Sequence, residues 1–309
     1  MPDIVTLTLN PALDVTTFAD EVVPTRKLRC DEPIYDAGGG GVNVAKVARV
    51  LGASAAAVYP AGGARGRQMS GLLADDDVQE HIVEIADDTR ECFTAIDRST
   101  GKEYRFVTPG PELTAEEQER CLEALVAAAS GARYVVASGS FPPGVPGMFV
   151  RRIADVAHKV GARFVLDSSG DALTSIESGV FLVKPSLDEL HEWVGRDLPD
   201  TATRTAAARE LVGAGVAEIV VVSLGAQGAI MVSADDAVEV PALDVPVHSA
   251  VGAGDSMVAG LVVGLLQERS LRDALALGIA CGSAALLTAG SHVCRREDID
   301  RFDELARSR

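Results

Sequence analysis

Apolar stretches rich in β-branched residues alternate with segments of helical periodicity along most of the chain. The apolar stretches lie at residues 3–9, 134–138, 164–167, 181–183 and 218–223. Apolar residues recur at helical spacing over 42–52, 114–131 and 147–160, and two long helices are predicted after Gly254. Thr114 and Glu117 have the spacing of a capping box, which marks a helix start. Continuous apolar strands that alternate with helices are typical of a parallel sheet covered on both faces, so the chain is predicted to have an α/β fold.

Two segments, residues 15–34 and about 90–107, depart from this pattern because polar and apolar residues alternate with period two. Such alternation indicates half-buried antiparallel strands. We therefore predict a small β-sheet that projects from the main body, formed by about residues 13–35 and 90–108. It would serve as a lid or as an interface, since an exposed apolar sheet face requires a partner. No linker, internal repeat or charge block divides the chain, so residues 1–309 are predicted to form one domain.

The composition excludes several classes of protein. The chain has 309 residues, of which 47% are hydrophobic, and a formal net charge of -17. A general nucleic-acid-binding protein needs a basic surface, which so acidic a chain does not predict. No apolar run approaches the roughly 18 residues of a membrane span, and the N-terminal residues are predicted to form a strand, not a signal peptide. The five cysteines are scattered without a CxxC pair, which indicates reduced thiols and a cytoplasmic location.

Candidate chemistry gathers in glycine-rich and polar loops at the predicted strand-to-helix junctions. In a parallel sheet, ligands bind at the carboxyl ends of the strands, where loops lead into helix N-termini. The loops are DAGGGGVN (36–43), SGSFPPG (138–144), DSSG (167–170), KPSLDE (184–189), SLGAQG (223–228) and SAVGAGD (249–255). Their common position predicts one ligand-binding edge of the sheet.

The SAVGAGD loop has the most specific chemistry. Its glycines allow backbone N–H groups to turn toward one point, and the helix that begins near Asp255 adds the positive end of its dipole. Together they would form an anion hole suited to a transferring phosphoryl group. Asp255 beside that hole could accept the proton of an attacking hydroxyl as a general base. The alternative is that Asp255 is an ordinary helix N-terminal residue and the glycines serve tight packing.

Two other loops carry weaker signals. Four consecutive glycines at 38–41 allow close approach of a ligand to the backbone, although a plain glycine turn explains them equally well. Asn43 occupies the place of the last glycine of a GxGxxG pattern, so that pattern is not present. Lys184 and Glu189 flank a turn in a way that suits a phosphate contact and a water-mediated magnesium contact, but a solvated surface pair explains their spacing better. No Walker A sequence occurs in the chain.

The order of these motifs along the chain resembles the PfkB family of carbohydrate kinases. The shared segments include TLTLNPALD (6–14), GGGGVNVA (38–45), YRFVTPG (104–110), SGSFPPGV (138–145), LVKPS (182–186), VVVSLGAQGA (220–229) and VGAGDSMV (251–258). The resemblance covers essentially the whole chain. It implies a ribokinase-like three-layer α/β sandwich, with a central mostly parallel sheet and a small projecting β-sheet lid. It also implies a kinase that uses ATP and Mg2+ and binds a monovalent cation, commonly K+.

The same resemblance implies roles for individual residues. Asp255 would be the catalytic base, and the amides of Gly252, Ala253 and Gly254 would form the anion hole. The implied sugar contacts are Asp14, Gly39, Asn43, Arg90 and Ser138, and the phosphate of the sugar would meet Lys27, Arg90 and Arg105. The nucleotide would lie along Lys184, Ser186, Ser223, Gly225, Gly228 and Ser283, with Glu189 near magnesium. The monovalent cation would bind around Ser249, Val251, Ala285 and Gly290.

Three sites differ from the usual family pattern. Ser186 stands where the family usually has the asparagine of an NxxE motif, and Ala250 stands where threonine or serine is usual. Thr288 and His292 occupy cation-loop positions that hold asparagine and arginine in similar enzymes. None of these differences removes a residue needed for phosphoryl transfer itself.

The resemblance is strongest to members that phosphorylate fructose 6-phosphate at its 1-hydroxyl with ATP, which is therefore the expected activity. Tagatose 6-phosphate and fructose 1-phosphate stay open as substrates, because the sequence does not show hydroxyl stereochemistry. Lys27, Arg90 and Arg105 disfavour a kinase of free sugars or nucleosides, and the intact Asp255 disfavours a non-catalytic sugar-phosphate sensor. The apolar face of the lid strands predicts a homodimer in which two lids pack together.

Overall fold

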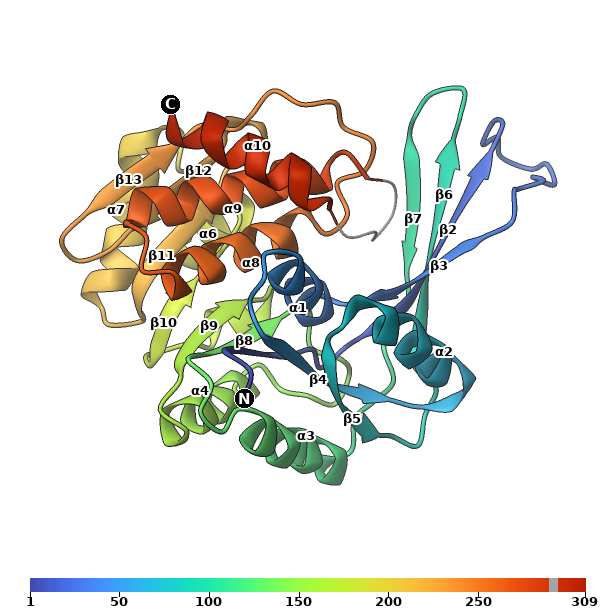
Figure 1. The fold of residues 1–309 in the computed structure, drawn as a ribbon, viewed down its shortest axis with the longest axis horizontal. Helices are drawn as coiled ribbons and strands as arrows, with labels where there is room; N and C mark the ends of the chain where they lie inside the picture. The colour runs from blue at the N-terminus through green and yellow to red at the C-terminus, as the bar shows by residue number, and fades with distance from the viewer. Residues whose placement is uncertain (289–293) are drawn as a thin grey trace.

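In the computed structural model, which describes residues 1–288 and 294–309, nine strands form one central sheet (Figure 1). Their spatial order is β13-β12-β11-β10-β9-β8-β1-β4-β5. The parallel strands are β1 (Ile4–Leu7), β4 (Ala55–Ala61), β5 (Gln79–Glu84), β8 (Tyr134–Ser138), β9 (Arg163–Asp167), β10 (Val180–Val183) and β11 (Ala217–Ser223). An antiparallel hairpin of β12 (Ala229–Val232) and β13 (Ala237–Val240) closes one edge.

Helices cover both faces of this sheet, and each face has its own apolar core. One face carries α1 (Gly40–Val50), α2 (Gly63–Leu73), α8 (Ala253–Leu266), α9 (Leu271–Ala285) and α10 (Arg296–Arg307). The other carries α3 (Ala115–Ala128), α4 (Phe149–Lys159), α5 (Asp171–Thr174), α6 (Leu187–Val194) and α7 (Thr201–Gly213). Strands covered in this way are largely apolar, and β8 and β10 are buried at every position. The predicted three-layer α/β fold is confirmed.

Four further strands form a separate sheet that projects from the main body, which we call the lid (Figure 1). They are β2 (Ala12–Ala19), β3 (Ile34–Gly38), β6 (Arg90–Asp97) and β7 (Glu103–Val107), in the spatial order β3-β2-β6-β7. The central strands β2 and β6 run parallel, and each outer strand is antiparallel to its neighbour. Phe106 and Val107 on the edge strand are 60% and 61% exposed, so the lid has an uncovered apolar patch.

Some elements differ from the prediction. The strand β4 (AAAVYPA) was not predicted because alanine favours helices, and it is a strand only because β1 and β5 flank it in the buried sheet. The neighbouring strand β5, the hairpin β12–β13 and the last helix α10 were not predicted either. The strands expected across residues 20–33 are wrong, because that stretch has only one bridge, between Ala19 and Cys30.

Across the described ranges, no helix is both long and apolar enough for a membrane crossing.

Candidate active site

Asp255 lies in the first turn of α8, at the carboxyl-end edge of the sheet. The helix follows Gly252, which has a left-handed φ of 73° that a residue with a Cβ rarely adopts. The first N–H groups of a helix have no partner four residues back, so the amides of Gly252, Ala253 and Gly254 suit an anion. Ala253 N makes only a long bond of 3.4 Å, to Ala250 O. Asp255 itself is partly exposed, so a ligand can reach it.

Two polar side chains from other elements contact the Asp255 carboxylate. Asn43 of α1 donates from Nδ2 to Oδ2 at 2.8 Å, and the Oγ of Ser138 at the end of β8 lies 3.5 Å from Oδ1. The other amide atom, Asn43 Oδ1, is buried and accepts no hydrogen bond from any residue that the structure describes. A buried acceptor without a donor suits a ligand hydroxyl. Three segments far apart in sequence therefore meet at one carboxylate.

The environment of Asp255 changes its acidity. Burial raises the pKa of Asp255 to about 6, and the nearby charge of Asp167 adds to this rise. The hydrogen bond from Asn43, the charge of Lys184 and the hydroxyl of Ser138 oppose it. A carboxylate whose pKa approaches the working pH accepts a proton from a hydroxyl more readily than an ordinary aspartate.

Lys184, predicted as a nucleotide contact, is paired with an aspartate that the sequence did not suggest. Its Nζ lies 2.9 Å from Asp167 Oδ1, and a Cβ atom placed on Gly254 would lie 3.9 Å from that Nζ. Burial lowers the pKa of Lys184, but the charges of Asp167, Glu189 and Asp255 outweigh it and hold the pKa above its ordinary value. The position of Asp167 directly after a parallel strand, in the DSSG loop, is the signal that could have identified it.

The glycine run at 38–41 lets α1 begin tightly against the strand ends. A Cβ atom on Gly40 would lie 2.4 Å from Ser138 Oγ, and one on Gly38 would lie 2.2 Å from Asp14 Oδ2. Gly39, predicted to contact the sugar, has a φ of +115° and packs closely on Thr8. The close approach that these glycines permit is therefore to the protein itself, and it places Asn43 and Ser138 together.

The lid contributes Asp14 and Arg105 to one small cavity, which Val251 of the loop before α8 also lines. These residues come from β2, β7 and the segment that leads into α8. The structure thus brings together the predicted sugar-side residues Asp14 and Arg105 and the predicted cation-loop residue Val251.

Arg90 is held by backbone carbonyls. Its guanidinium donates to Asn10 O at 2.9 Å, to Thr108 O at 3.1 Å and to Pro11 O at 3.4 Å. Arginine has five N–H donors, so only the remaining ones can contact a phosphate. Arg90 therefore ties the base of the lid to two connecting segments, a structural role that the sequence did not indicate.

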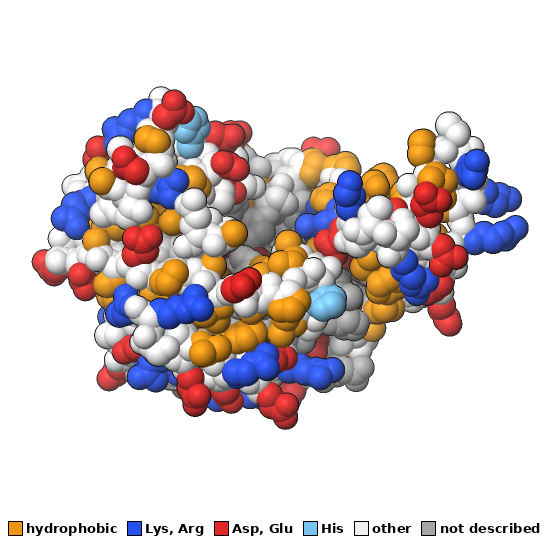
Figure 2. Space-filling model, turned by 90° about the horizontal axis from the view of Figure 1, so that it is seen from above, with side chains coloured by type: hydrophobic (Ala, Val, Ile, Leu, Met, Phe, Trp, Pro, Cys, Tyr) orange, Lys and Arg blue, Asp and Glu red, His pale blue; other side chains and the backbone are white. Residues whose placement is uncertain are grey.

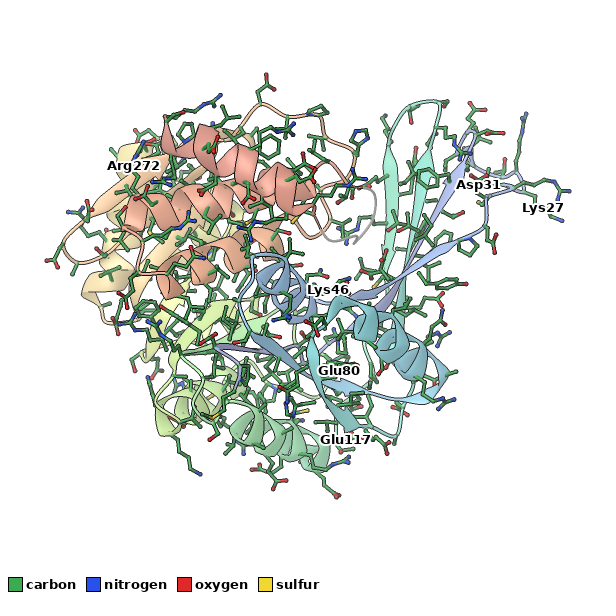
Figure 3. The ribbon with its side chains drawn as sticks, in the orientation of Figure 1. Lys27, Asp31, Lys46, Glu80, Glu117 and Arg272 are labelled. Atoms are coloured by element: carbon green, nitrogen blue, oxygen red, sulfur yellow. The ribbon has the colours of Figure 1, made fainter. Side chains whose placement is uncertain are left out.

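Lys27 lies apart from the other predicted residues. Figure 3 shows it at the free end of the lid, away from Lys46 of α1, the helix that carries Asn43. In Figure 2 basic side chains gather at this end of the lid, and the exposed residues of the β2–β3 connection include Arg26, Lys27 and Arg29. Within one chain, Lys27 is not brought to Asp255.

The predicted nucleotide residues lie along the next strand ends. Ser186 caps α6: its Oγ accepts from Glu189 N at 3.2 Å, and its own N–H donates to Glu189 Oε2 at 2.7 Å. This SLDE capping box is visible in the sequence but was not predicted. Ser186 also bridges Ser223 at the end of β11. The loop after β11 includes Gly225 and Gly228, both with positive φ, and Ser283 is buried on α9.

The predicted cation residues lie partly in the described structure. Ser249 is buried, its Oγ accepts from Val251 N at 3.1 Å, and its own N–H donates to Leu286 O at 3.5 Å, beside Ala285 at the end of α9. Gly290 and His292 lie outside the described residues. Within residues 1–288 and 294–309, no cluster of three or more His, Cys, Asp or Glu side chains could hold a metal ion.

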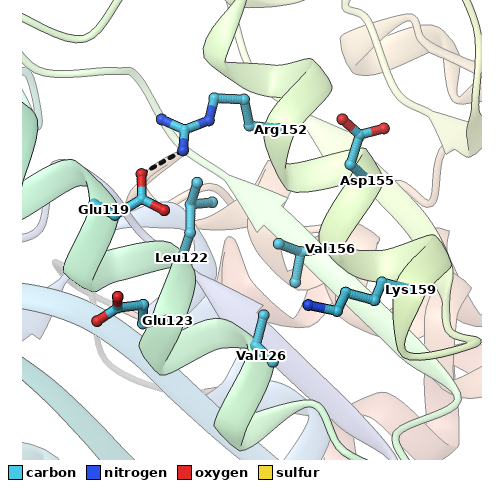
Figure 4. Close-up of a pocket in the computed structure, with 8 residues that line it drawn as sticks. All are labelled: Glu119, Leu122, Glu123, Val126, Arg152, Asp155, Val156 and Lys159. Carbon is cyan, nitrogen blue, oxygen red and sulfur yellow. Dashed lines mark hydrogen bonds and ion pairs between the residues drawn. The ribbon is translucent and has the colours of Figure 1, made fainter.

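A separate groove of about 450 Å³ lies between α3 and α4 (Figure 4). It has an apolar floor, which includes Leu122 and Val156, and a bond between Glu119 and Arg152 crosses its rim. None of the predicted site residues lines it, so it is not part of the candidate active site.

Residues 8–298 match the family described as pfkB family carbohydrate kinase. This chain belongs to that family. The pfkB match spans the main body and the lid, so the predicted membership and the predicted transfer of phosphate to a sugar hydroxyl are confirmed.

Similar proteins agree with the pfkB assignment. The chain is 49% identical to an ATP-dependent 6-phosphofructokinase isozyme 2 of Mycobacterium tuberculosis, over 99% of this chain and 90% of the relative. It is 41% identical to the protein of the same name from Escherichia coli, over 98% of both chains, and 33% identical to a 1-phosphofructokinase of Haloferax volcanii, over 96% and 95%. The solved structure of Escherichia coli phosphofructokinase-2 with substrates and products superposes with a TM-score of 0.94 at 40% identity, over 99% of both chains.

Proposed function

We propose that this pfkB family kinase transfers the γ-phosphoryl group of ATP to the 1-hydroxyl of fructose 6-phosphate. The observation that carries the proposal is the contact of Asn43 and Ser138 with Asp255 in the first turn of α8. Two similar proteins named ATP-dependent 6-phosphofructokinase isozyme 2 support this choice of substrate, because the similarity extends over nearly the whole chain.

The sugar would lie between the lid and α1. The unpaired Asn43 Oδ1 would accept a hydrogen bond from a sugar hydroxyl, and Asp14 would orient the ring from β2. Arg105 and the free N–H groups of Arg90 would bind the 6-phosphate, because guanidinium groups grip phosphate with directional, charge-assisted bonds. Local cations are needed for this purpose, since the net charge of -17 repels a sugar phosphate at long range.

Asp255 would accept the proton of the 1-hydroxyl as the oxygen attacks the γ-phosphorus. The new oxygen–phosphorus bond forms while the bond from the γ-phosphorus to the bridging oxygen breaks, and ADP leaves. The amides of Gly252, Ala253 and Gly254 would stabilise the charge on the equatorial oxygens. Lys184, beside Gly254, would balance charge on the nucleotide phosphates.

The residues at the nucleotide side suit a magnesium ion that arrives with ATP. Only one carboxylate oxygen of Glu189 accepts a hydrogen bond in the described part of the chain, so the other can face a water molecule of hydrated magnesium. Magnesium bound there supplies neutralisation of charge on the β- and γ-phosphates. Backbone and hydroxyl oxygens around Ser249, Val251 and Ala285 suit potassium, which proteins bind through rings of carbonyl oxygens. One solved structure of Escherichia coli phosphofructokinase-2 is described as a potassium complex.

A coupled assay of ADP release across a panel of sugars tests the substrate. The panel contains fructose, fructose 6-phosphate, tagatose 6-phosphate and fructose 1-phosphate, and the highest kcat/KM is expected for fructose 6-phosphate. A preference for fructose 1-phosphate would support the activity in the name of the Haloferax volcanii relative. Equal turnover of free fructose would contradict the phosphosugar assignment and leave the kinase assignment intact.

We also propose that the enzyme is a homodimer formed through the lid. Phe106 and Val107 support this, because an exposed apolar patch on an edge strand needs cover. The end of the lid carries Lys27 away from its own active site, so Lys27 could meet a phosphate only in the site of a partner chain. A solved structure of the Escherichia coli relative is described as its tetrameric inhibited form, so that protein self-associates.

The cytoplasm is the compartment that we propose for this enzyme. All five cysteines are free, and Cys121, Cys281 and Cys294 are buried. Free thiols persist where the glutathione and thioredoxin systems keep them reduced.

A further inference from the structure

Asp167 connects the predicted phosphate-side lysine with the proposed base. Its Oδ1 lies 2.9 Å from Lys184 Nζ, and its Oδ2 accepts a hydrogen bond from Ser138 Oγ at 3.3 Å. The same hydroxyl lies 3.5 Å from Asp255 Oδ1. Ser138 and Asp167 are register partners on β8 and β9, so the sheet itself fixes this arrangement. The result is one polar row that runs from Lys184 through Asp167 and Ser138 to Asp255.

Most of this row is shielded from solvent, so its charges are weakly screened. The side chains of Lys184 and Asp167 are only 7% and 15% exposed, and Ser138 is buried. Charges at such positions interact more strongly than charges in water. Among the other charged groups on nearby elements, Glu189 acts on Lys184 through its charge, Lys46 of α1 pairs with Asp76 at 3.3 Å, and Arg49 of α1 pairs with Asp77.

We propose that Asp167 is a positioning residue of the phosphoryl-transfer site, which holds the Lys184 ammonium group beside the anion hole and prepares Asp255 to accept the proton of the sugar hydroxyl. The inference rests on the proposed function of Asp255 as the base. Asp167 raises the proton affinity of Asp255 in two ways. The negative charge of Asp167 disfavours a second negative charge on Asp255, and its ion pair keeps Lys184 from pairing with Asp255 instead.

The acidity of Asp255 agrees with this arrangement. Burial is the main cause that raises its pKa to about 6, the charge of Asp167 is the next, and the charge of Lys184 acts against them. Removal of the Asp167 charge should therefore lower the pKa of Asp255 and make it a weaker base.

The test is a carbon-13 NMR titration of the free enzyme labelled at aspartate carboxyl carbons. The Asp255 signal is assigned as the one that disappears in Asp255→Asn. Its midpoint is expected near pH 6 in the parent and at least about half a pH unit lower in Asp167→Asn, because a neighbouring like charge shifts a carboxylate by such amounts or more. Asp171→Asn removes an exposed aspartate from the segment after the same strand and should leave the midpoint unchanged.

A second pair of variants separates the charge of Asp167 from its hold on Lys184. Lys184→Met should raise the Asp255 midpoint, and the double variant Lys184→Met, Asp167→Asn should lower it again by about half a unit or more. The double variant also replaces both partners of the buried pair, which is better tolerated than loss of one partner. It therefore decides the question if Asp167→Asn alone does not fold.

Kinetics complete the test. In Asp167→Asn, kcat should fall about 3-fold or more while the KM for fructose 6-phosphate stays within a few fold, since a weaker base transfers the proton less readily. An unchanged or raised midpoint in both Asp167→Asn backgrounds would overturn the proposal for Asp167. Near-normal turnover of Asp255→Asn would instead overturn the assignment of the base, so the two failures can be distinguished.

Discussion

At the scale of single residues, the charge of Asp255 has a cost in stability. Its pKa is raised from 3.8 to about 6, so the folded protein holds this proton more tightly than the unfolded chain does. Stability contributed by the protonated group is present at low pH and is lost as the pH rises through about 6. Asp255→Asn should therefore be more stable than the parent at pH 8, by about 1–3 kcal/mol, and by about half as much at pH 5. Calorimetry at both pH values measures this, and an equal difference at the two would contradict it.

The same substitution tests catalysis. Asp255→Asn should lower turnover by about 100-fold or more, because general-base assistance typically contributes that much. Binding of fructose 6-phosphate should stay within a few fold, since Asn43, Arg105 and the lid remain. The matched control is Asp235→Asn, which replaces an exposed aspartate in the turn between β12 and β13 and should behave like the parent.

Arg90→Ala should change both substrate binding and stability. Loss of a charge-assisted bond to the 6-phosphate should raise the KM for fructose 6-phosphate by roughly 10- to 100-fold, equivalent to about 1.5–3 kcal/mol, and leave the KM for ATP nearly unchanged. Loss of its three bonds to backbone carbonyls should also lower the melting temperature. Arg105→Ala is the comparison, because it should raise the same KM with a smaller loss of stability. A lower melting temperature with both KM values unchanged would leave Arg90 with a structural role alone.

At the scale of elements, two helices begin with a capping box, one far from the candidate site and one beside it. Thr114 and Glu117 cap α3, and Ser186 and Glu189 cap α6 at the nucleotide side. Thr114→Ala and Ser186→Ala should each reduce stability by about 1 kcal/mol, the usual contribution of a cap. Only Ser186→Ala should also raise the magnesium concentration needed for half-maximal rate, because the Ser186 hydroxyl accepts from the Glu189 N–H and so fixes the backbone position of Glu189. Equal magnesium requirements in the two variants would argue against a role of Glu189 in magnesium binding.

At the scale of the whole molecule, the lid should determine the oligomeric state. The substitutions Phe106→Ser and Val107→Ser together remove the exposed apolar patch and should convert the proposed dimer to a monomer at micromolar concentration. Light scattering measures the mass. Met148→Ser, which removes a 58% exposed methionine elsewhere, should leave the dimer intact. A parent protein that is monomeric and fully active would disprove the dimer.

Local features could be predicted because neighbouring residues determine them. The capping box of Thr114 and Glu117 depends on one helical turn, and both of its hydrogen bonds are present. The apolar runs predicted most of the parallel strands, since a strand buried on both faces has few polar positions. The chemistry near Asp255 could likewise be read from SAVGAGD, because glycines and a helix start lie within seven consecutive residues. The sequence by itself thus determined the layered fold, the edge of the sheet at which the candidate site lies and the choice of Asp255 as candidate base.

Tertiary structure alone decided which residues act on one another. The partner of Lys184 is Asp167, a contact made only because β9 and β10 are neighbours in the sheet. From the sequence, Arg90 was expected to be available for phosphate, yet three of its guanidinium N–H groups donate to carbonyls of two connecting segments. Lys27 is close to Asp14 in sequence, but the lid carries it to the far end of the molecule. Contacts of this kind depend on strand order and on the direction of the lid, which arise from packing over the whole chain and leave no periodic signal in any short segment.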